Sequence, residues 1–304
     1  MKIRPYWQAM RLERWPRSLA ILVGTGAFFF LHWPSPDNPS LFEILLKAFL
    51  AFALTWGIST ANYIINEIVD APYDIHHPTK RLRPYVRGEV QPLIFLSWQI
   101  FLTVSSLMGA YFLFSPAFFF SLLILLFAGF IYNIKPIRTK DIPFLDSISE
   151  SANNPIRFLI GWFAFAPANL WPPISLLLAW WAFGNFLMVA KRLSEFRFLK
   201  DKAGMYRASL KKYSRTKLLV GMIFSILAFY ACFIYFALQY RLVSFTIPGL
   251  LLIFFVAVIF KKTLREKGVM EEPERLIQDK RFLGLLLLIM GSFILVILFE
   301  RGGL

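Results

Sequence analysis

Long apolar stretches recur along the whole chain and are separated by short polar or basic connections. Nine stretches are of a length that suits a membrane-crossing helix or lies near its short limit, since about 20 apolar residues cross roughly 30 Å of hydrocarbon. The predicted spans are Ser18–Trp33, Leu41–Val69, Pro92–Phe114, Ala117–Tyr132, Ser149–Leu170, Pro173–Ala190, Leu218–Leu238, Phe245–Phe260 and Phe282–Phe299. The pattern therefore predicts an all-α integral membrane protein with about nine transmembrane helices.

Composition supports this prediction and argues against a soluble domain, a cysteine-based framework or metal site, and a cleaved signal peptide. The chain has 304 residues, is 58% hydrophobic and contains 34 Phe, with a mean hydropathy of +0.59, which exceeds what the core of a soluble domain needs. Cys232 is the only cysteine, so neither a disulfide framework nor a thiolate metal site is expected within one chain. Residues 1–17 are basic and aromatic without a small-residue cleavage site, which indicates an interfacial segment rather than a cleaved signal peptide.

Positive charge sets the expected orientation. Of the 33 Lys and Arg residues, 29 fall in five segments, namely 1–17, 70–91, 133–148, 191–217 and 261–281. The positive-inside rule then places the N-terminus and these segments in the cytoplasm and the C-terminus outside. The formal charge of +15 is thus a topology signal and an attraction to anionic lipids, and it does not indicate nucleic acid, because no basic segment carries a nucleic-acid-binding motif.

A stripe of oxygen ligands lies at the cytoplasmic end of the second span. Asn62, Asn66, Asp70 and Asp74 are spaced by four, so they share one face for as long as the helix lasts. Two carboxylates with amide oxygens suit Mg²⁺, which is usually held together with substrate phosphates. The adjacent pair His76–His77 is more typical of solvated loop residues than of ligands.

Basic residues follow this stripe at once. Lys80, Arg81, Arg83 and Arg87 could bind the phosphates of a metal-bound substrate. The alternative is an ordinary helix end with acidic residues followed by a basic cytoplasmic loop.

Two further polar groups lie on the predicted cytoplasmic side. Glu150 and Arg157 share one face entering the fifth span, where a deep arginine marks a functional site or forms a structural ion pair with Glu150 or Asp146. After the sixth span, Lys191 and Glu195 share a face, as either a helical ion pair or part of a second phosphate clamp.

These motifs resemble those of the UbiA superfamily of intramembrane prenyltransferases. The resemblance covers about residues 10–240 and rests on Asn66-x-x-x-Asp70-x-x-x-Asp74 followed by Pro78, Lys80, Arg83 and Pro84. It implies a nine-helix bundle around a central cavity that opens to the cytoplasm and sideways to lipid, with Mg²⁺ holding a phosphorylated donor. Glu67 stands where many members have Asp, and Pro72 is expected to end or kink the helix before Asp74.

The loop after the sixth span departs from the family pattern and carries information. It reads Lys191-Arg192-Leu-Ser-Glu195, without the second aspartate pair of enzymes that use polyprenyl diphosphate. With His77-Pro-Thr-Lys80-Arg81-x-Arg83-Pro84 and Arg207-x-Ser-Leu-x-x-Tyr213, it is most similar to the decaprenyl-phosphate phosphoribosyltransferase branch. That resemblance implies transfer of 5-phosphoribosyl from phosphoribosyl diphosphate to a polyprenyl phosphate, with release of diphosphate.

The resemblance also implies roles for individual residues. Asn62, Asn66, Asp70 and Asp74 would hold the metal. The phosphate-binding set would be Lys80, Arg81, Arg83, Tyr132, Lys135, Arg157, Lys191 and Arg192, with Glu195 orienting its basic neighbours. Asp70, Asp74, Lys191 and Arg192 would be catalytic.

Two other functions stay open on the sequence. One is a prenyltransferase that moves a polyprenyl group from its diphosphate to an aromatic or quinone-precursor acceptor; the other is a non-enzymatic lipid transporter or binding scaffold. The chain is expected to be one transferase domain, residues 1–304, in the cell (inner) membrane with its active site facing the cytoplasm and residues 261–281 as a cytoplasmic connection. No feature indicates the oligomeric state.

Overall fold

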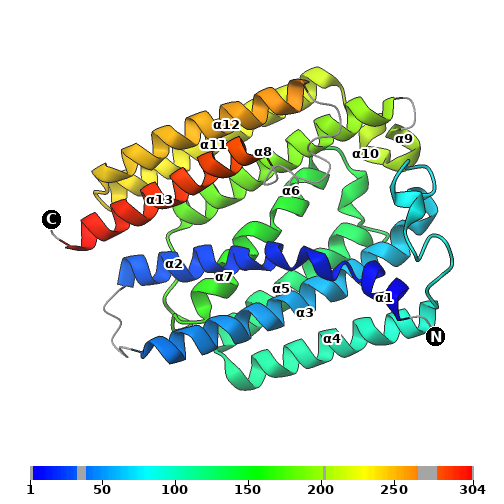
Figure 1. The fold of residues 1–304 in the computed structure, drawn as a ribbon, viewed down its shortest axis with the longest axis horizontal. Coiled ribbons are helices and arrows are strands. Elements are labelled where there is room, and N and C mark those ends of the chain that lie inside the picture. The colour runs from blue at the N-terminus through cyan, green and yellow to red at the C-terminus, as the bar shows by residue number, and fades with distance from the viewer. Residues whose placement is uncertain (1–2, 33–38, 201–202, 266–278, 303–304) are drawn as a thin grey trace. The chain divides into compact units, whose positions relative to one another are not determined.

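The structure is helical throughout its described part. The computed structural model describes residues 3–32, 39–200, 203–265 and 279–302, and every regular element within them is a helix (Figure 1). The chain divides into two compact units, Met1–Pro172 with Gly204–Ser209, and Pro173–Ala203 with Leu210–Leu304. The predicted all-α fold is confirmed.

The first unit carries the N-terminal helices. Its elements are α1 (Arg4–Ala9), the 3₁₀ helix η1 (Leu12–Ala20), α2 (Ile21–His32), α3 (Leu41–Asp74), η2 (Lys80–Leu82), α4 (Pro92–Leu113), α5 (Pro116–Asn133), η3 (Thr139–Asp141), α6 (Leu145–Ser151) and α7 (Asn153–Phe163). Helix α3 packs against α4 and α5, while α2 and α5 pack against α7. The segment Gly204–Ser209 also belongs here and includes most of the short helix α9 (Ala203–Tyr206).

The second unit is built on a long helical pair. Its elements are α8 (Ile174–Leu199), α11 (Arg215–Gln239), η5 (Val243–Phe245), α12 (Thr246–Arg265) and α13 (Lys280–Gly302), with the end of α10 (Ala208–Lys211). Helix α11 packs along α8, and α12 packs against both α8 and α13. The predicted connection 261–281 is described only at its ends, because 266–278 lie outside the described residues.

Serine caps begin three of the long helices. The Ser40 hydroxyl accepts a hydrogen bond from the Glu43 amide, and the Glu43 carboxylate accepts one from the Ser40 amide at 2.8 Å, so α3 starts with a capping box. Ser115 caps α5 and Ser214 caps α11 in the same sense.

Seven helices of the described chain are long and apolar enough to cross a membrane. They are α3, α4, α5, α8, α11, α12 with its preceding turn, and α13. The two other predicted spans contain α2 and α7, which have 12 and 11 residues and reach only roughly 18 Å at 1.5 Å per residue. An integral membrane protein is confirmed, whereas the count of nine spans and the orientation of the termini stay predictions.

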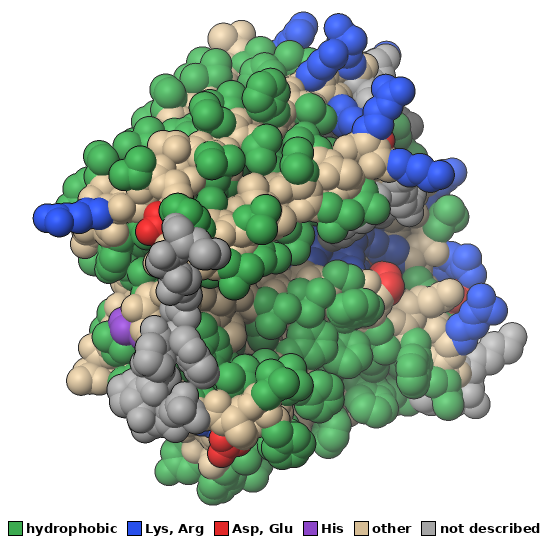
Figure 2. Space-filling view, turned by 60° about the vertical axis from the view of Figure 1, so that its left-hand side comes forward, with side chains coloured by type: hydrophobic (Ala, Val, Ile, Leu, Met, Phe, Trp, Pro, Cys, Tyr) green, Lys and Arg blue, Asp and Glu red, His purple; other side chains and the backbone are tan. Residues whose placement is uncertain are grey.

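Large apolar side chains lie on the outside of these helices. Phe42, Phe112 and Ile174 are each 73% exposed, and apolar side chains cover most of the face seen in Figure 2. A soluble monomer rarely shows such extended apolar surface. Contact with lipid tails accounts for it.

Reciprocal glycines allow α2 and α7 to approach closely. A Cβ atom on Gly24 would lie 1.9 Å from the Phe158 carbonyl oxygen, and one on Gly161 would lie 1.8 Å from the Ile21 carbonyl oxygen. Thr25 donates a hydrogen bond to the Gly161 carbonyl at 3.0 Å across the same contact. Small residues of this kind let membrane helices pack backbone to backbone.

Alanine at Gly161 is therefore expected to destabilise the protein by about 1–3 kcal/mol, because the two helix backbones must move apart. Gly26→Ala on α2 is the matched control, since nothing lies within 4 Å of its added Cβ and alanine is the better helix former. Thermal unfolding in detergent measures both variants. Equal midpoints for Gly161→Ala and the wild type would contradict the close contact.

Candidate active site

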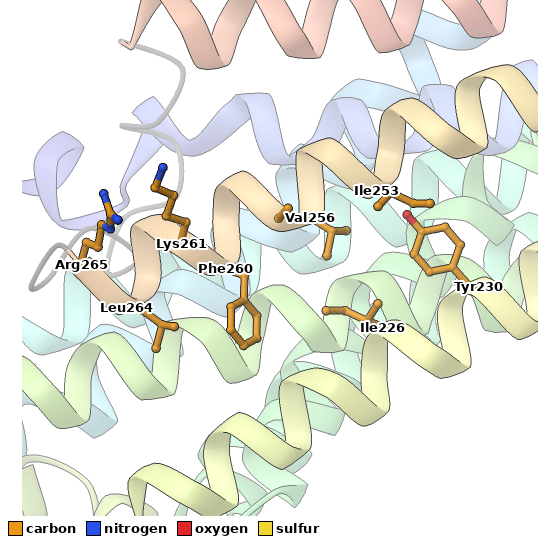
Figure 3. A pocket seen from close by; sticks show the side chains of 9 residues that line it. Ile226, Tyr230, Ile253, Val256, Phe260, Lys261, Leu264 and Arg265 are labelled. Carbon is orange, nitrogen blue, oxygen red and sulfur yellow. The ribbon is translucent and has the colours of Figure 1, made fainter.

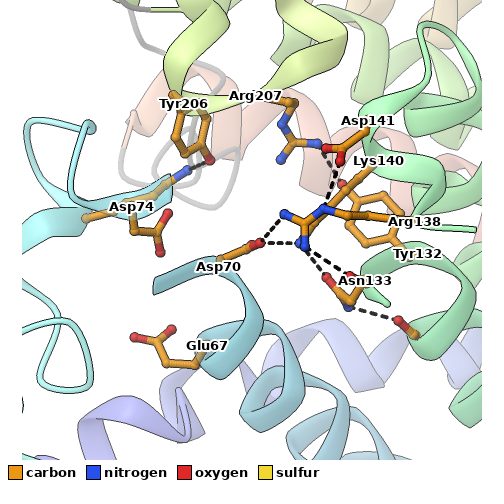
Figure 4. Close-up of polar contacts among 12 residues, drawn as sticks. Glu67, Asp70, Asp74, Tyr132, Asn133, Arg138, Lys140, Asp141, Tyr206 and Arg207 are labelled. Carbon is orange, nitrogen blue, oxygen red and sulfur yellow. Dashed lines mark hydrogen bonds and ion pairs between the residues drawn. The ribbon is translucent and has the colours of Figure 1, made fainter. Parts of the chain in front are cut away.

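The last turns of α3 carry the predicted ligands. Helix α3 continues through Pro72 and ends at Asp74, so Pro72 does not end the helix before Asp74, and the alternative expectation of a kink stays a prediction. Because an α-helix has 3.6 residues per turn, Asn66, Asp70 and Asp74 lie on successive turns and near one face of α3. Figure 4 shows Asp70 and Asp74 near the end of this helix, with Asp70 directed at a basic cluster from other segments.

Asp74 is buried and paired with arginine. Its side chain is 2% exposed and forms an ion pair with Arg83, which also lies 3.5 Å from Glu67. Glu67 in turn pairs with Arg11 from the N-terminal segment. Burial opposes the charge of Arg11, but the pull of Glu67 outweighs it and the pKa of Arg11 lies above its usual value. Glu67, one turn before Asp70, therefore ties the N-terminal segment to α3.

Asp70 is held by two cations from the segment that follows α5. The Lys140 ammonium contacts its carboxylate directly, and Arg138 donates to it at 3.2 Å. Lys140 also donates to the Asn133 side chain at 2.8 Å. Burial lowers the pKa of Lys140 to about 8, with Asp70 opposing that shift and Arg138 adding to it.

The position of Arg138 is fixed by its surroundings. Its backbone has φ +30° and ψ +64°, in the left-handed region that non-glycine residues seldom adopt. Besides Asp70, its guanidinium donates to Asp141 at 2.9 Å and to the Asn133 carbonyl at 3.1 Å, and it lies over the Tyr73 ring at 4.5 Å. These contacts fix the planar guanidinium of Arg138, with its several N–H donors, beside Asp70.

A second group of contacts involves Tyr206 and Arg207, which follow α8 in the chain. Lys80 donates to the Tyr206 hydroxyl and lies 4.3 Å from its ring centre. Arg207 donates to the Tyr132 hydroxyl at 2.9 Å, and that hydroxyl donates to Glu150 at 2.9 Å. Arg207 is also near enough to Asp70 and Lys140 to interact electrostatically with both.

His77 is a buried residue that packs against Tyr206 of the same group. It is fully buried, its Nδ1 lies 3.2 Å from the Thr79 hydroxyl, and its ring packs edge-on against Tyr206 at 4.8 Å. His76 is exposed. The expectation that both histidines are solvated was therefore wrong for His77, because the turn after α3 folds back over its ring.

Several predicted residues lie away from this cluster. Asn62 donates to the Leu125 carbonyl at 2.9 Å and packs against Gly129 on α5. Arg157 is buried and donates to the Ser59 hydroxyl at 3.2 Å, so its observed partner is neither Glu150 nor Asp146. Arg81 and Lys135 are exposed.

The predicted second clamp belongs to the second unit. Arg192 and Glu195 are 0% and 1% exposed and form an ion pair of 2.7 Å, while Lys191 is half-buried. Glu195 thus orients Arg192, one of the two partners proposed for it. A direct role of Lys191 and Arg192 toward phosphate stays a prediction.

The sequence interpretation missed Arg138 and Lys140, the cations that contact Asp70, and it named Arg207 only as part of a motif, without a role at the site. It also missed Arg11 and Tyr206. Arg138 and Lys140 sit in a basic run directly after an apolar span, and that signal could have identified them as candidates.

The donor set suits Mg²⁺ if substrate completes it. Within the described residues, no group of three or more His, Cys, Asp or Glu side chains is placed to hold a metal ion. Asp70, whose side chain is 16% exposed, and Asp74 supply two carboxylates on adjacent turns, and Asn66 supplies an amide oxygen. Mg²⁺ binding through one or two carboxylates together with phosphates and waters needs no more than this.

Helix α3 presents two carboxylates beside clustered cations, an arrangement that suits a phosphorylated substrate bound through a metal ion. A sequence profile of the UbiA prenyltransferase family matches residues 19–274. The match spans most of the chain, and the protein belongs to this family. The resemblance noted in the sequence is thereby confirmed.

Relatives with assigned names point to one branch. The decaprenyl-phosphate phosphoribosyltransferase of Mycobacterium tuberculosis (strain ATCC 25618 / H37Rv) is 27% identical over 285 residues, covering 92% of this chain and 90% of the relative. The enzyme of the same name from Mycolicibacterium smegmatis is 26% identical, with 74% and 68% covered.

Solved structures confirm the fold. A UbiA homologue from Archaeoglobus fulgidus bound to GPP and Mg²⁺ aligns with a TM-score of 0.69 at 20% identity, covering 96% of this chain and 99% of that one. Its form bound to DMAPP and Mg²⁺ gives the same TM-score at 19% identity. At 19–20% identity, this likeness shows that the chain shares the helical fold of these structures.

Proposed function

We propose that this protein transfers a 5-phosphoribosyl group from phosphoribosyl diphosphate to a polyprenyl phosphate and releases diphosphate. The observation that carries the proposal is the place of Arg207. It comes from the connection after α8, donates to Tyr132 and brings a cation toward Asp70. The end of α8 itself, Lys191–Glu195, lacks the second aspartate pair of enzymes that use polyprenyl diphosphate. A donor with three phosphate groups and a lipid phosphate acceptor together require such positive charge.

One set of residues around Asp70 would bind the metal ion, and a second set would bind the phosphate groups. Asp70 and Asp74, with Asn66 and with Asn62 if it leaves Leu125, would hold Mg²⁺. Bound there, the ion would neutralise charge that develops on the departing diphosphate. The remaining cations bind phosphate oxygens and orient the donor; they are Lys80, Arg83, Arg138, Lys140 and Arg207.

The chemical step follows from that orientation. An oxygen of the lipid phosphate attacks C1 of the ribosyl group, a new C–O bond forms, and the bond from C1 to diphosphate breaks with its electrons leaving on diphosphate. The nucleophile is already an anion, so no general base is required. Holding the two reactants in line is the main contribution of the protein.

The cellular setting belongs to the same proposal. Residues 1–304 form one transferase domain in the inner membrane, and the site opens to the cytoplasm, where phosphoribosyl diphosphate is soluble. The basic segments 70–91 and 133–148, which follow α3 and α5 in the chain, support this orientation through the positive-inside rule.

Release of diphosphate by the purified protein tests the reaction. With Mg²⁺ and a polyprenyl phosphate, we expect turnover with phosphoribosyl diphosphate and none with a polyprenyl diphosphate plus an aromatic acid. Turnover with the second pair alone would replace the proposal by an ordinary prenyltransferase. No turnover with either pair, while lipid still binds, would favour a scaffold or transporter.

Arg207→Gln should raise the KM for phosphoribosyl diphosphate about ten- to a hundredfold, since a hydrogen bond to a charged group contributes about 1.5–3 kcal/mol. Arg215→Gln is the matched control, because Arg215 is an exposed residue at the start of α11. Steady-state kinetics at varied donor concentration measures both. An unchanged KM in Arg207→Gln would remove Arg207 from donor binding.

A further inference from the structure

A groove runs between α11 and α12 in the second unit. Its volume is about 480 Å³, and Ile226 and Tyr230 of α11 line it opposite Ile253 and Phe260 of α12 (Figure 3). From Ile253 to Arg265, which also lines it, α12 advances roughly 18 Å at 1.5 Å per residue. The groove is therefore long enough to hold much of an extended hydrocarbon chain.

Positive charge lies at one end only. Lys261 and Arg265 line the groove at the C-terminal end of α12, are four residues apart and are both exposed. Within the part of the chain that the structure describes, neither has an acidic partner, whereas the neighbouring Lys262 pairs with Asp279 at 2.8 Å. The rest of the lining is apolar except for Tyr230.

Tyr230 lies beside Ile253, at the end of the groove away from the two cations (Figure 3). Its hydroxyl is buried and has no hydrogen-bond partner among the described residues. It lies well inside a helix that is long enough to cross the membrane, where water is absent and an unsatisfied hydroxyl is costly. This end of the groove therefore suits an acyl chain and not a charged head group.

We propose that this groove binds an anionic phospholipid of the surrounding bilayer. Its phosphate lies between Lys261 and Arg265, and one acyl chain follows Phe260, Ile226 and Ile253 toward Tyr230. Charge complementarity decides the occupant, because basic pockets between membrane helices select anionic head groups over zwitterionic ones. The site is separate from Asp70 and does not depend on the proposed reaction.

Native mass spectrometry of the full chain in detergent tests this with two lipids of identical acyl chains. We expect one phosphatidylglycerol to bind at least tenfold more tightly than phosphatidylcholine. The double variant Lys261→Gln/Arg265→Gln should lose that preference. The matched control Lys212→Gln/Lys217→Gln removes the same charge from exposed residues outside the groove and should keep it.

Tyr230→Phe provides an independent arm, since it deletes only the hydroxyl. It should keep the preference for phosphatidylglycerol, because Tyr230 lies at the end of the groove away from Lys261 and Arg265. Equal affinity for the two lipids in the wild type, or phosphatidylglycerol binding that survives the double variant, would overturn the proposal. Displacement of phosphatidylglycerol by an equimolar polyprenyl phosphate would also overturn it, by assigning the groove to the substrate lipid.

Discussion

Asp70→Asn is expected to lower the rate of diphosphate release at least a hundredfold while the protein stays folded. The amide keeps the shape of the side chain but removes the negative charge that a hard cation needs as a ligand. Loss of one group that stabilises developing charge commonly costs a factor of 10²–10³ in rate. The variant should also bind Mn²⁺, used as a spectroscopic probe, more weakly than the wild type.

Asp70 also holds Lys140 and Arg138, so the variant needs a correction for stability. Removing one partner of a buried pair leaves the other charge uncompensated. The double variant Asp70→Asn/Lys140→Met removes both members of the Asp70–Lys140 pair, while Arg138 keeps its contact with Asp141. It should recover thermal stability without recovering activity. Glu89→Gln, at an exposed pair with Arg87, changes the same charge elsewhere and should be fully active. Full activity in Asp70→Asn would end the metal-ligand assignment.

The positions of most helices were predictable because long apolar stretches mark the membrane-crossing segments in the sequence. Each of the nine apolar stretches overlaps a helix of the described structure, and α4 and α5 begin within one residue of the prediction. Helix α3 exceeds its predicted range, because apolar content marks the lipid-facing part and gives no signal for the last polar turn through Asp74. Helix α7 is shorter than its stretch, in which the apolar residues continue past Phe163 without helical backbone.

The sequence predicted the part of the candidate site that lies on one helix. It did not predict the contacts that other segments of the chain make with that helix. The four-residue spacing of Asp70 and Asp74 on one helix follows from sequence alone. The hydrogen-bond donors to Asp70, Arg138 and Lys140, lie 68 and 70 residues away in the sequence, and no spacing rule connects such positions. Arg138 is the clearest case, because a left-handed backbone at a non-glycine residue is imposed by tertiary contacts rather than by local preference.

Arg192→Leu is expected to destabilise the protein by about 3–5 kcal/mol, the second large effect. Arg192 and Glu195 are 0% and 1% exposed and 2.7 Å apart on α8, and truncating one member of a buried pair leaves a buried charge without its partner. Unfolding in a detergent titration, followed by circular dichroism, measures the change. Lys200→Gln, at an exposed position just after α8, is the control and should unfold like the wild type.

The double variant Arg192→Leu/Glu195→Leu separates structure from catalysis. Replacing both charges by apolar groups of similar size is often neutral for stability, so we expect the unfolding midpoint to return. If Arg192 acts only through its pairing with Glu195, phosphoribosyl transfer should return with it. If Arg192 binds phosphate, transfer should stay at least tenfold low in a fully folded protein. Because Glu195 already compensates the charge of a fully buried Arg192, we expect activity to return, which would leave the half-buried Lys191 as the basic residue of this turn that can reach a substrate.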